Sequence, residues 1–219
     1  MKRRAGGFSL IEIMVVMAIL AALMAGGFLM LRKAQENRMK TEAQSRLTAL
    51  GAGIDALATQ DNLGSYPPTE TIKLIGPGKA GPAVGATLGA NNGKNVGIET
   101  VYVALRLKGT KVTVEGFEAE DALGNTDADM ANGMVPEMAK PDFYEYLDPW
   151  NNPYVYFHNG DYKSPQKVER YVKGDGTEVK AVPRMKANGE FVRPSSFQLF
   201  SMGPDGTPNT DDDLVYQVQ

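Results

Sequence analysis

One uninterrupted apolar run, from Phe8 to Leu31, constrains this chain more than any other feature of its sequence. The run holds 24 residues and a single charge, Glu12. As an α-helix that rises about 1.5 Å per residue it is roughly 36 Å long, which exceeds the roughly 30 Å of a bilayer's hydrocarbon core. A core helix of a globular domain normally has a polar face, and this run has none. We therefore expect residues 8–31 to form a transmembrane helix.

The segment before this run carries three positive charges and a pair of small residues. Residues 1–7 are MKRRAGG, and Arg32 and Lys33 close the run on its other side. Both flanks are basic, so the positive-inside rule gives little information on orientation. The three charges of the leader come first in the chain, and they favour a cytoplasmic N-terminus. An ordinary secretory signal has an apolar region of about 7–15 residues followed by its cleavage site. Here the run is longer and Gly6-Gly7 precedes it, so cleavage at this pair would leave the helix on the protein.

The junction Gly7-Phe8-Ser9-Leu10-Ile11-Glu12 resembles the processing signal of type IV pilins and of type II secretion pseudopilins. The resemblance implies that a prepilin peptidase removes the leader, residues 1–7, by cutting after Gly7. It also implies that the same enzyme N-methylates the new first residue, Phe8. Glu12 becomes the fifth residue of the mature chain. In the family this glutamate pairs with the α-amino group of a neighbouring subunit and sets the axial register of the filament.

Glu12 is costly where it stands, which supports a role in assembly. A carboxylate at the centre of a membrane-spanning helix costs roughly 2.5–3.5 kcal/mol on insertion scales, and less near an interface. A partner charge on a neighbouring subunit would offset this cost. The alternative is a carboxylate that is solvated near the lipid headgroups and has no role.

The helix is expected to continue beyond the membrane over residues 32–60, which contain no proline. Its apolar residues recur at spacings of three and four and form one stripe: Leu47, Leu50, Ile54 and Leu57. Polar residues occupy the other faces, so this amphipathic half should pack on a globular domain. Gly51 and Gly53 predict fraying, and the cluster at 61–68 predicts the end of the helix.

Residues 61–219 are expected to form a periplasmic globular domain of mixed structure. The apolar segment 98–107 predicts a helix. Alternating or apolar stretches predict four strands, at 111–117, 155–157, 197–201 and 214–218. Segments 76–97 and 121–129 are predicted loops, and 162–193 is predicted to be irregular. The predicted fold class is therefore α+β, with the long N-terminal helix packed on a small antiparallel sheet with long loops. This is the pilin fold that the resemblance implies.

Two C-terminal segments extend the resemblance. Asp148–Tyr154 is DPWNNPY, and Ser201–Leu214 is SMGPDGTPNTDDDL. Both are similar to the C-terminal signature of the major (G-type) pseudopilins of type II secretion. The resemblance covers residues 1–68 and 146–219. It implies a structural subunit that polymerises through its N-terminal helix into a pseudopilus and drives protein export.

The same resemblance implies partners and a location. The partners are copies of the chain itself, minor pseudopilins, the prepilin peptidase, and an inner-membrane assembly platform with its ATPase. Before assembly the chain would be a single-pass protein of the inner membrane with its body in the periplasm. After assembly it would belong to a periplasmic filament.

Four aspartates crowd the acidic loop 201–214, and they are a candidate calcium site. Ca²⁺ takes about six to eight oxygen ligands, and the glycines of this loop allow it to curl. The spacing of an EF-hand is absent, so spacing alone leaves a solvated acidic turn equally open. In the family this loop holds calcium, and the resemblance therefore favours a Ca²⁺ site. The candidate ligands, in order, are Asp205, Asp212, Asp213, Asp211 and Thr210.

The sequence offers few residues for catalysis. It has one histidine, His158, and no cysteine. These counts exclude a Cys nucleophile and a paired-His metal motif, and His158 is expected in a turn. The formal charge is −3, and removal of Lys2, Arg3 and Arg4 with the leader leaves −6. An acidic body does not suit phosphate binding. We therefore expect neither an enzyme nor a nucleic-acid-binding protein.

Two other functions stay open at this point. A type IV pilus or competence pilin would serve adhesion, motility or DNA uptake. The C-terminal segments favour secretion over this alternative, and the lack of a C-terminal cysteine pair weighs against a disulfide-looped pilin. The second open function is that of a membrane-anchored binding domain that never polymerises. A bulky residue in place of Gly7 would separate it from a pilin, because only a pilin depends on removal of its leader.

Overall fold

A computed structural model describes residues 10–60, 66–70, 91–106, 112–117, 122–130 and 143–217 of the 219-residue chain. The chain divides into two compact units, Met1–Met39 and Lys40–Gln219. The first unit is helical in its described part. The second unit, called the body below, contains all of the strands.

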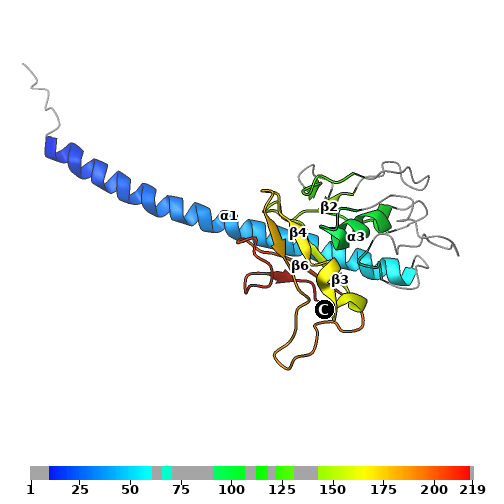
Figure 1. Ribbon diagram of the computed structural model, residues 1–219. Coiled ribbons are helices and arrows are strands. Elements are labelled where there is room, and N and C mark those ends of the chain that lie inside the picture. The colour runs from blue at the N-terminus through cyan, green and yellow to red at the C-terminus, as the bar shows by residue number, and fades with distance from the viewer. Residues whose placement is uncertain are drawn as a thin grey trace, which may run out of the picture. The chain divides into compact units, whose positions relative to one another are not determined.

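Helix α1, Leu10–Gln60, supplies the described part of the first unit and is drawn from blue to cyan in Figure 1. Its sequence contains no proline that would break it. Every large apolar side chain that is described between Leu10 and Leu31 is between 43% and 79% exposed. Among the residues that the structure describes, no helix has both the length and the apolarity needed to cross a membrane.

Within the body, the C-terminal part of α1 contributes one face to the core. The predicted apolar stripe is confirmed, since all four of its residues are fully buried: Leu47, Leu50, Ile54 and Leu57. The prediction that Gly51 and Gly53 fray the helix is wrong, because α1 continues to Gln60. An added Cβ would come within 2.5 Å of the Tyr216 ring at Gly51 and of Val114 Cγ2 at Gly53. These glycines are therefore sites of close packing.

Helix α3, Val96–Arg106, is buried over its whole length except at Arg106. The helix predicted at 98–107 is thus confirmed, although it begins two residues earlier. It packs against β2 and β3, whose bounds follow. Gly97 permits this packing, because a Cβ at that position would lie 2.3 Å from the Tyr156 carbonyl oxygen.

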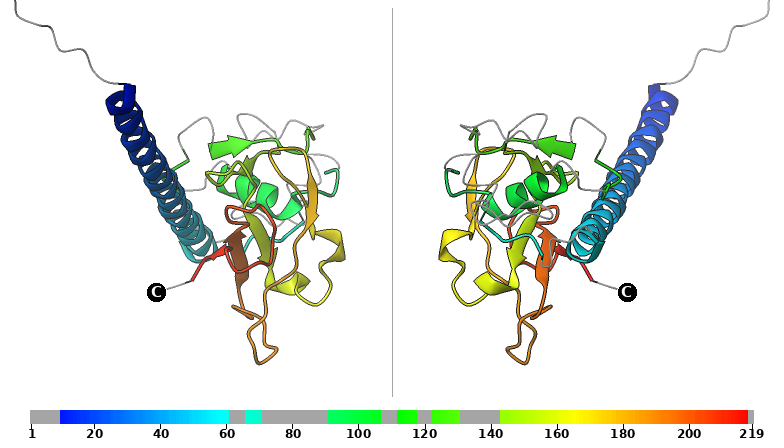
Figure 2. Two further views of the ribbon diagram at one scale, coloured as in Figure 1. Left: turned by 90° about the vertical axis from the view of Figure 1, so that its left-hand side faces the viewer. Right: turned by 90° about the vertical axis from the view of Figure 1, so that its right-hand side faces the viewer.

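The strands form three small antiparallel sheets. The largest has the order β3-β6-β7, with bounds Val155–His158, Phe197–Ser201 and Leu214–Val215. Phe200 stands opposite Val155 on one side and Val215 on the other. Figure 2 shows β6 (orange) beside β3 (yellow-green). The two-stranded sheets pair β1 (Leu123–Gly124) with β2 (Glu145–Tyr146) and β4 (Arg170–Val172) with β5 (Glu178–Lys180).

The fold class is α+β as predicted, with several small sheets where one was expected. The strands predicted at 155–157 and 197–201 are confirmed, and the last strand is shorter than its predicted range 214–218. The segment predicted to be irregular, 162–193, contains β4 and β5, so that prediction is wrong there. Most of the predicted loop 76–97 lies outside the described residues.

The strand predicted at 111–117 is also wrong. Residues 112–117 contain no strand, and Glu115 and Gly116 form a turn in which Gly116 has a φ of 88°. Val112 and Val114 alternate in sequence because both pack against the core. Their partner includes Gly53 of α1 rather than a neighbouring strand.

Candidate functional site

The residues predicted to be processed and to direct assembly lie at the start of the chain. Gly7 and Phe8 are outside the described residues. Glu12 lies on α1 and is exposed, as are the apolar residues around it, such as Leu10 and Ile11. The structure thus places the carboxylate of Glu12 on a helical surface that is otherwise apolar and is exposed.

The two predicted C-terminal segments are joined through Asp148, which is buried before β3. Its Oδ1 accepts the backbone N–H groups of Trp150 at 3.0 Å and Asn152 at 2.9 Å. Its Oδ2 accepts the hydroxyl of Ser201, at the end of β6, at 2.6 Å. Ser201 Oγ accepts the N–H of Gly203 at 3.1 Å. Burial raises the pKa of Asp148 to about 6, although these hydrogen bonds act in the opposite direction.

Asp212 organises the loop between β6 and β7. Its Oδ2 accepts the N–H of Asp205 at 3.2 Å, and its Oδ1 accepts the hydroxyl of Thr210 at 2.7 Å. Burial raises the pKa of Asp212, but these hydrogen bonds outweigh burial, so its pKa lies below the ordinary value. Gly203 has a φ of 66°, and a Cβ there would lie 2.5 Å from the Asp212 carbonyl oxygen. Only glycine fits this position without strain.

Asp213 is the most deeply placed carboxylate of this loop, with a side chain that is 0% exposed. It forms an ion pair with Arg184, and its Oδ2 accepts the N–H of Asn209 at 2.8 Å. Its Oδ1 is buried and has no hydrogen-bond partner. Burial raises the pKa of Asp213 to about 6; Arg184 opposes this change, and the charges of Asp212 and Asp205 increase it.

These contacts bear on the predicted calcium ligands. The unpartnered Oδ1 of Asp213 is an acceptor that a hard cation would satisfy, and the negative charge of Asp212 lies near it. Asp205 and Asp211 are exposed. Of the carboxylates that the structure describes, no three from this loop bring their oxygens within 4.8 Å of one another. Asp212 and Asp213, with a hydroxyl or carbonyl oxygen such as that of Thr210, are the residues that fit a cation here.

Sequence analysis missed Arg184, which lies between β5 and β6 in the segment predicted to be irregular. Its N–H donates to Gln198 Oε1 at 2.6 Å, and its guanidinium lies 3.5 Å from the carbonyl oxygen of Thr210 and pairs with Asp213. No local pattern indicates this role, because the partners are far apart in the sequence.

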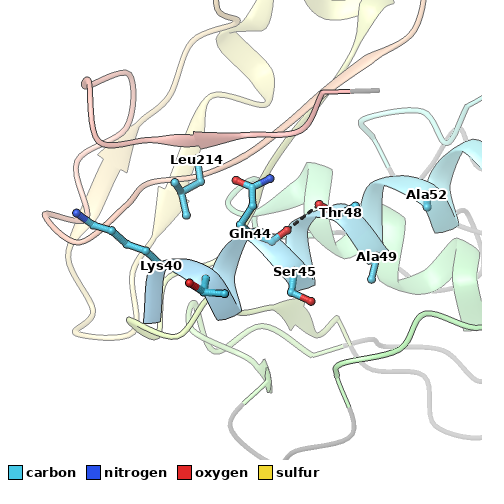
Figure 3. A pocket seen from close by; sticks show the side chains of 8 residues that line it. Lys40, Gln44, Ser45, Thr48, Ala49, Ala52 and Leu214 are labelled. Carbon is cyan, nitrogen blue, oxygen red and sulfur yellow. Dashed lines mark hydrogen bonds between the residues drawn. The ribbon is translucent and has the colours of Figure 1, made fainter. Parts of the chain in front are cut away.

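A groove beside α1 is lined by neither a carboxylate nor a histidine. Figure 3 shows the side chains that line it: Lys40, Thr41, Gln44, Ser45, Thr48, Ala49, Ala52 and Leu214. None of them is a carboxylate or a histidine. The hydroxyl of Thr48 donates to the Gln44 carbonyl oxygen at 2.8 Å. His158 has the turn role predicted for it, because its Nδ1 accepts the N–H of Gly160 at 3.0 Å and caps the short helix Asn159–Asp161.

A second group of carboxylates was not predicted. Sequence analysis treated 121–129 only as an acidic loop. The structure brings Asp127 of this loop together with Glu99 of α3 and Glu145 of β2. The three residues come from separate elements, so no sequence spacing indicates that they meet.

Comparison with known proteins bears on the N-terminus. Residues 2–28 match the family model of the prokaryotic N-terminal methylation motif. The N-terminus of this chain carries a prokaryotic methylation motif. The match confirms the type IV pilin-like resemblance that Gly7, Phe8 and Glu12 predict.

Among solved structures, this chain is similar to the major pseudopilin from the type 2 secretion system of enterohaemorrhagic Escherichia coli. The two are 18% identical, with a TM-score of 0.32, over 84% of this chain and 91% of that chain. No curated protein matches this chain.

Proposed function

We propose that this chain is a pseudopilin, a structural subunit that polymerises through its N-terminal helix into a type II secretion-like pseudopilus and drives protein export. The observation that carries the proposal is an apolar helix surface, exposed from Leu10 to Leu31, that lies in and directly after the methylation motif. A helix of this kind needs an apolar environment, and a filament of such helices, which the methylation motif supports, supplies it.

The energetics require that this surface be covered. Burial of one large apolar side chain contributes about 1.5–3 kcal/mol relative to exposure in water. Summed over the exposed residues between Leu10 and Leu31, this reaches tens of kcal/mol, more than the roughly 5–15 kcal/mol that stabilise a whole domain. Lipid covers the helix before assembly, and other copies of the helix cover it in the filament. Because both environments are apolar, transfer between them costs little hydrophobic energy.

Glu12 gives this otherwise uniform surface a register. In the mature chain it pairs with the α-amino group of Phe8 in a neighbouring subunit. An ion pair in an apolar environment is directional and strong when its geometry is good. Apolar contacts alone would let neighbouring helices slide, because one part of the surface resembles the next.

The remaining parts of the proposal follow from this role. The chain is a single-pass inner-membrane protein with its body in the periplasm until it joins a periplasmic filament. The prepilin peptidase processes it, an assembly platform with its ATPase extracts it, and minor pseudopilins join the same filament. Its role is structural rather than enzymatic. The body holds Ca²⁺ in the loop 201–214, with Asp212 and Asp213 as the main ligands.

Processing is tested by the mass of the mature chain. The full chain is produced together with a prepilin peptidase and analysed by mass spectrometry. We expect loss of residues 1–7 and one methyl group on Phe8. The variant Gly7→Val should keep its leader, whereas the matched control Gly6→Ala should be processed. An intact leader on the wild-type chain, or loss of the helix together with the leader, contradicts the proposal.

Assembly is tested by charge removal on α1. Glu12→Gln should be processed and should stay in the membrane but form no filaments, as judged by electron microscopy of sheared material. Glu36→Gln, which removes an exposed carboxylate from the same helix outside the apolar run, should assemble normally. Equal assembly of both variants would refute the role of Glu12. If loss of filaments abolishes surface pili and leaves secretion intact, the chain is a pilus pilin instead.

A further inference from the structure

Three carboxylates from separate elements meet inside the body. Glu99 lies in the first turn of α3, Asp127 follows β1, and Glu145 lies in β2. One carboxylate oxygen of each residue lies within 4.8 Å of those of the other two. The fold brings them together because Gly124 pairs with Glu145 and α3 packs against β2. Figure 1 labels α3 and β2.

Two oxygens of this cluster, Oε1 of Glu99 and Oδ2 of Asp127, are buried without a donor. Glu99 is 0% exposed; its Oε2 accepts the side-chain amide of Asn91, but its Oε1 is buried without a partner. Oδ2 of Asp127, Oδ1 of Asp129 and Oδ1 of Asn125 are also buried and unpartnered. All four are acceptors. Buried polar groups in folded proteins nearly always have a partner, so this concentration of unpartnered acceptors requires a cation or protons.

Among the residues that the structure describes, no cationic side chain forms an ion pair with any of the three carboxylates. Burial raises the pKa of Asp127; Lys94 lies near enough to oppose this change, but its ion pair is with Glu178 at 3.7 Å. Burial raises the pKa of Glu99 well above its ordinary value, and the charges of Asp129, Asp127 and Glu145 raise it further. Burial likewise raises the pKa of Glu145 to about 8 and that of Asp129 to about 6. A bound cation would reverse each of these effects.

We propose that Glu99, Asp127 and Glu145 bind a structural calcium ion, with Asp129 and the side-chain oxygen of Asn125 as further ligands. All of these ligands are hard oxygens, which suit Ca²⁺ and not the nitrogen- and sulfur-preferring Zn²⁺. Two Ca–O bonds of about 2.3–2.6 Å place ligand oxygens on opposite sides of the ion up to roughly 5 Å apart. The observed cluster fits this span without a change of backbone. Mg²⁺ requires shorter bonds and near-octahedral geometry.

One short segment after β1 supplies three of these ligands. Asn125, Asp127 and Asp129 lie on a loop that bends at Thr126 and Asp127 and has Ala128 at a φ of 59°. The side-chain amide of Asn125 donates to the carbonyl oxygen of Asp129. Its Oδ1 is thereby left as the acceptor on the other side of the amide.

Hydrogen bonds behind Glu145 hold it in place. Asn95 Nδ2 donates to its Oε1 at 2.8 Å, and the N–H of Thr126 donates to its Oε2 at 3.0 Å. Both partners are fixed by β4: Asn95 Oδ1 accepts the N–H of Val172 at 2.8 Å, and the Thr126 hydroxyl donates to the Val172 carbonyl oxygen at 2.7 Å. Such bonds orient the carboxylates that bind metals, and here they exist in the chain itself.

Calcium binding at this cluster would fasten α3, the segment after β1, and β2 to one another. The cluster shares no residue with the loop 201–214. The inference therefore stands whether or not the chain polymerises, and whether or not that loop binds calcium.

The test uses the full chain, purified in detergent and stripped of metal with EGTA. Calorimetric titration with CaCl₂ gives the number of ions bound, and thermal unfolding followed by circular dichroism gives their effect on stability. We expect Ca²⁺ at about a hundredfold excess over Kd to raise Tm by roughly 5–10 °C. MgCl₂ at the same concentration should raise it much less.

Charge-neutral variants assign the effect to the cluster. Glu99→Gln keeps the side-chain shape and should bind one ion fewer and lose this shift in Tm. In EGTA it should be at least as stable as the wild type, because one buried charge is gone. Asp127→Asn, on a half-buried loop residue, is a second variant with the same expected loss of the ion. Asp212→Asn and the exposed surface change Glu190→Gln should both keep the ion of the cluster.

Two results would overturn the inference. One is a wild-type chain whose Tm does not respond to Ca²⁺. The other is retention of the wild-type stoichiometry and shift by both Glu99→Gln and Asp127→Asn. A cluster that shares protons gives the first result, together with stability that rises as the pH falls. Neither result affects the proposed function, which is measured by leader removal and filament formation.

Discussion

Replacement of Gly51 by alanine tests how α1 packs on the end of the chain. Tyr216, which follows β7, lies flat against this glycine, and a Cβ would come within 2.5 Å of three of its ring carbons. The ring is held from other sides as well. It stacks on Phe197 with centroids 5.8 Å apart, and its hydroxyl donates to Asp55 Oδ2 at 2.8 Å.

Two effects of opposite sign determine the outcome. In an unconstrained helix, Gly→Ala is stabilising by about 1 kcal/mol. A methyl group added to a packed core costs about 1–3 kcal/mol, because neighbouring side chains must move. At Gly51 the moving group is Tyr216, which also risks its stacking partner and its hydrogen bond to a carboxylate. We expect a net loss of roughly 1–2 kcal/mol in the free energy of unfolding.

A double-mutant cycle separates the two effects. Urea unfolding is followed by the fluorescence of the single tryptophan, Trp150, in the wild type, Gly51→Ala, Tyr216→Ala and the double variant. In the Tyr216→Ala background, Gly51→Ala should become stabilising by about 0.5–1 kcal/mol. Gly27→Ala, where a Cβ meets no atom within 4 Å, is the control without a packing cost. If Gly51→Ala stabilises the wild type as much as it stabilises Tyr216→Ala, the packing argument is refuted.

Three further predictions concern the C-terminal segments. Ser201→Ala should lower the free energy of unfolding by about 1–3 kcal/mol, measured in urea, because Asp148 Oδ2 loses its donor while buried; no change would show that Asp148 has another partner. Because the folded-state pKa of Asp148 is raised to about 6, its contribution to stability is fully present below about pH 4 and is lost as the pH rises through about 6. Asp148→Asn should therefore flatten the stability profile between these values, and an identical profile would contradict the assignment. Arg184→Gln should lower the free energy of unfolding by about 3–5 kcal/mol, because it leaves Asp213 buried without its ion-pair partner. Adding Asp213→Asn to Arg184→Gln should restore part of this stability, as measured by thermal unfolding. A double variant no more stable than Arg184→Gln would argue against the ion pair.

The features that could be predicted from sequence are those whose information is local. The stripe from Leu47 to Leu57 follows the helical period, and each of its members is buried. The strand at 197–201 is a short apolar run that ends at a glycine- and proline-rich turn. In both cases the residues that define the helix or strand lie close to one another in the sequence.

The wrong predictions of strands concern residues whose structure depends on partners far away in the sequence. Val112 and Val114 alternate as strand residues do, but their partner is a glycine on α1 some sixty residues earlier, so alternation here reports burial and not pairing. β4 and β5 were missed because each has only three residues and β5 has a charged residue at both ends. Arg170 stands opposite Lys180 and reaches diagonally to Glu178, with Nε and Oε1 2.6 Å apart, and strands this short leave no apolar pattern in the sequence.

The two acidic groups of the body show why the density of charge along the sequence is a poor guide to a cation site. Consecutive side chains point in different directions, so Asp205 and Asp211 of the aspartate-rich loop face solvent, while Asp213 meets Arg184. Glu99 and Glu145 are isolated in the sequence, yet burial and strand pairing bring them together with Asp127, and no described side chain forms an ion pair with any of the three. The unpartnered acceptor, and not the run of carboxylates, is the better indicator of a site. If both groups bind calcium, the losses of stability caused by Glu99→Gln and Asp212→Asn at saturating Ca²⁺ should add, because the two sites share no residue.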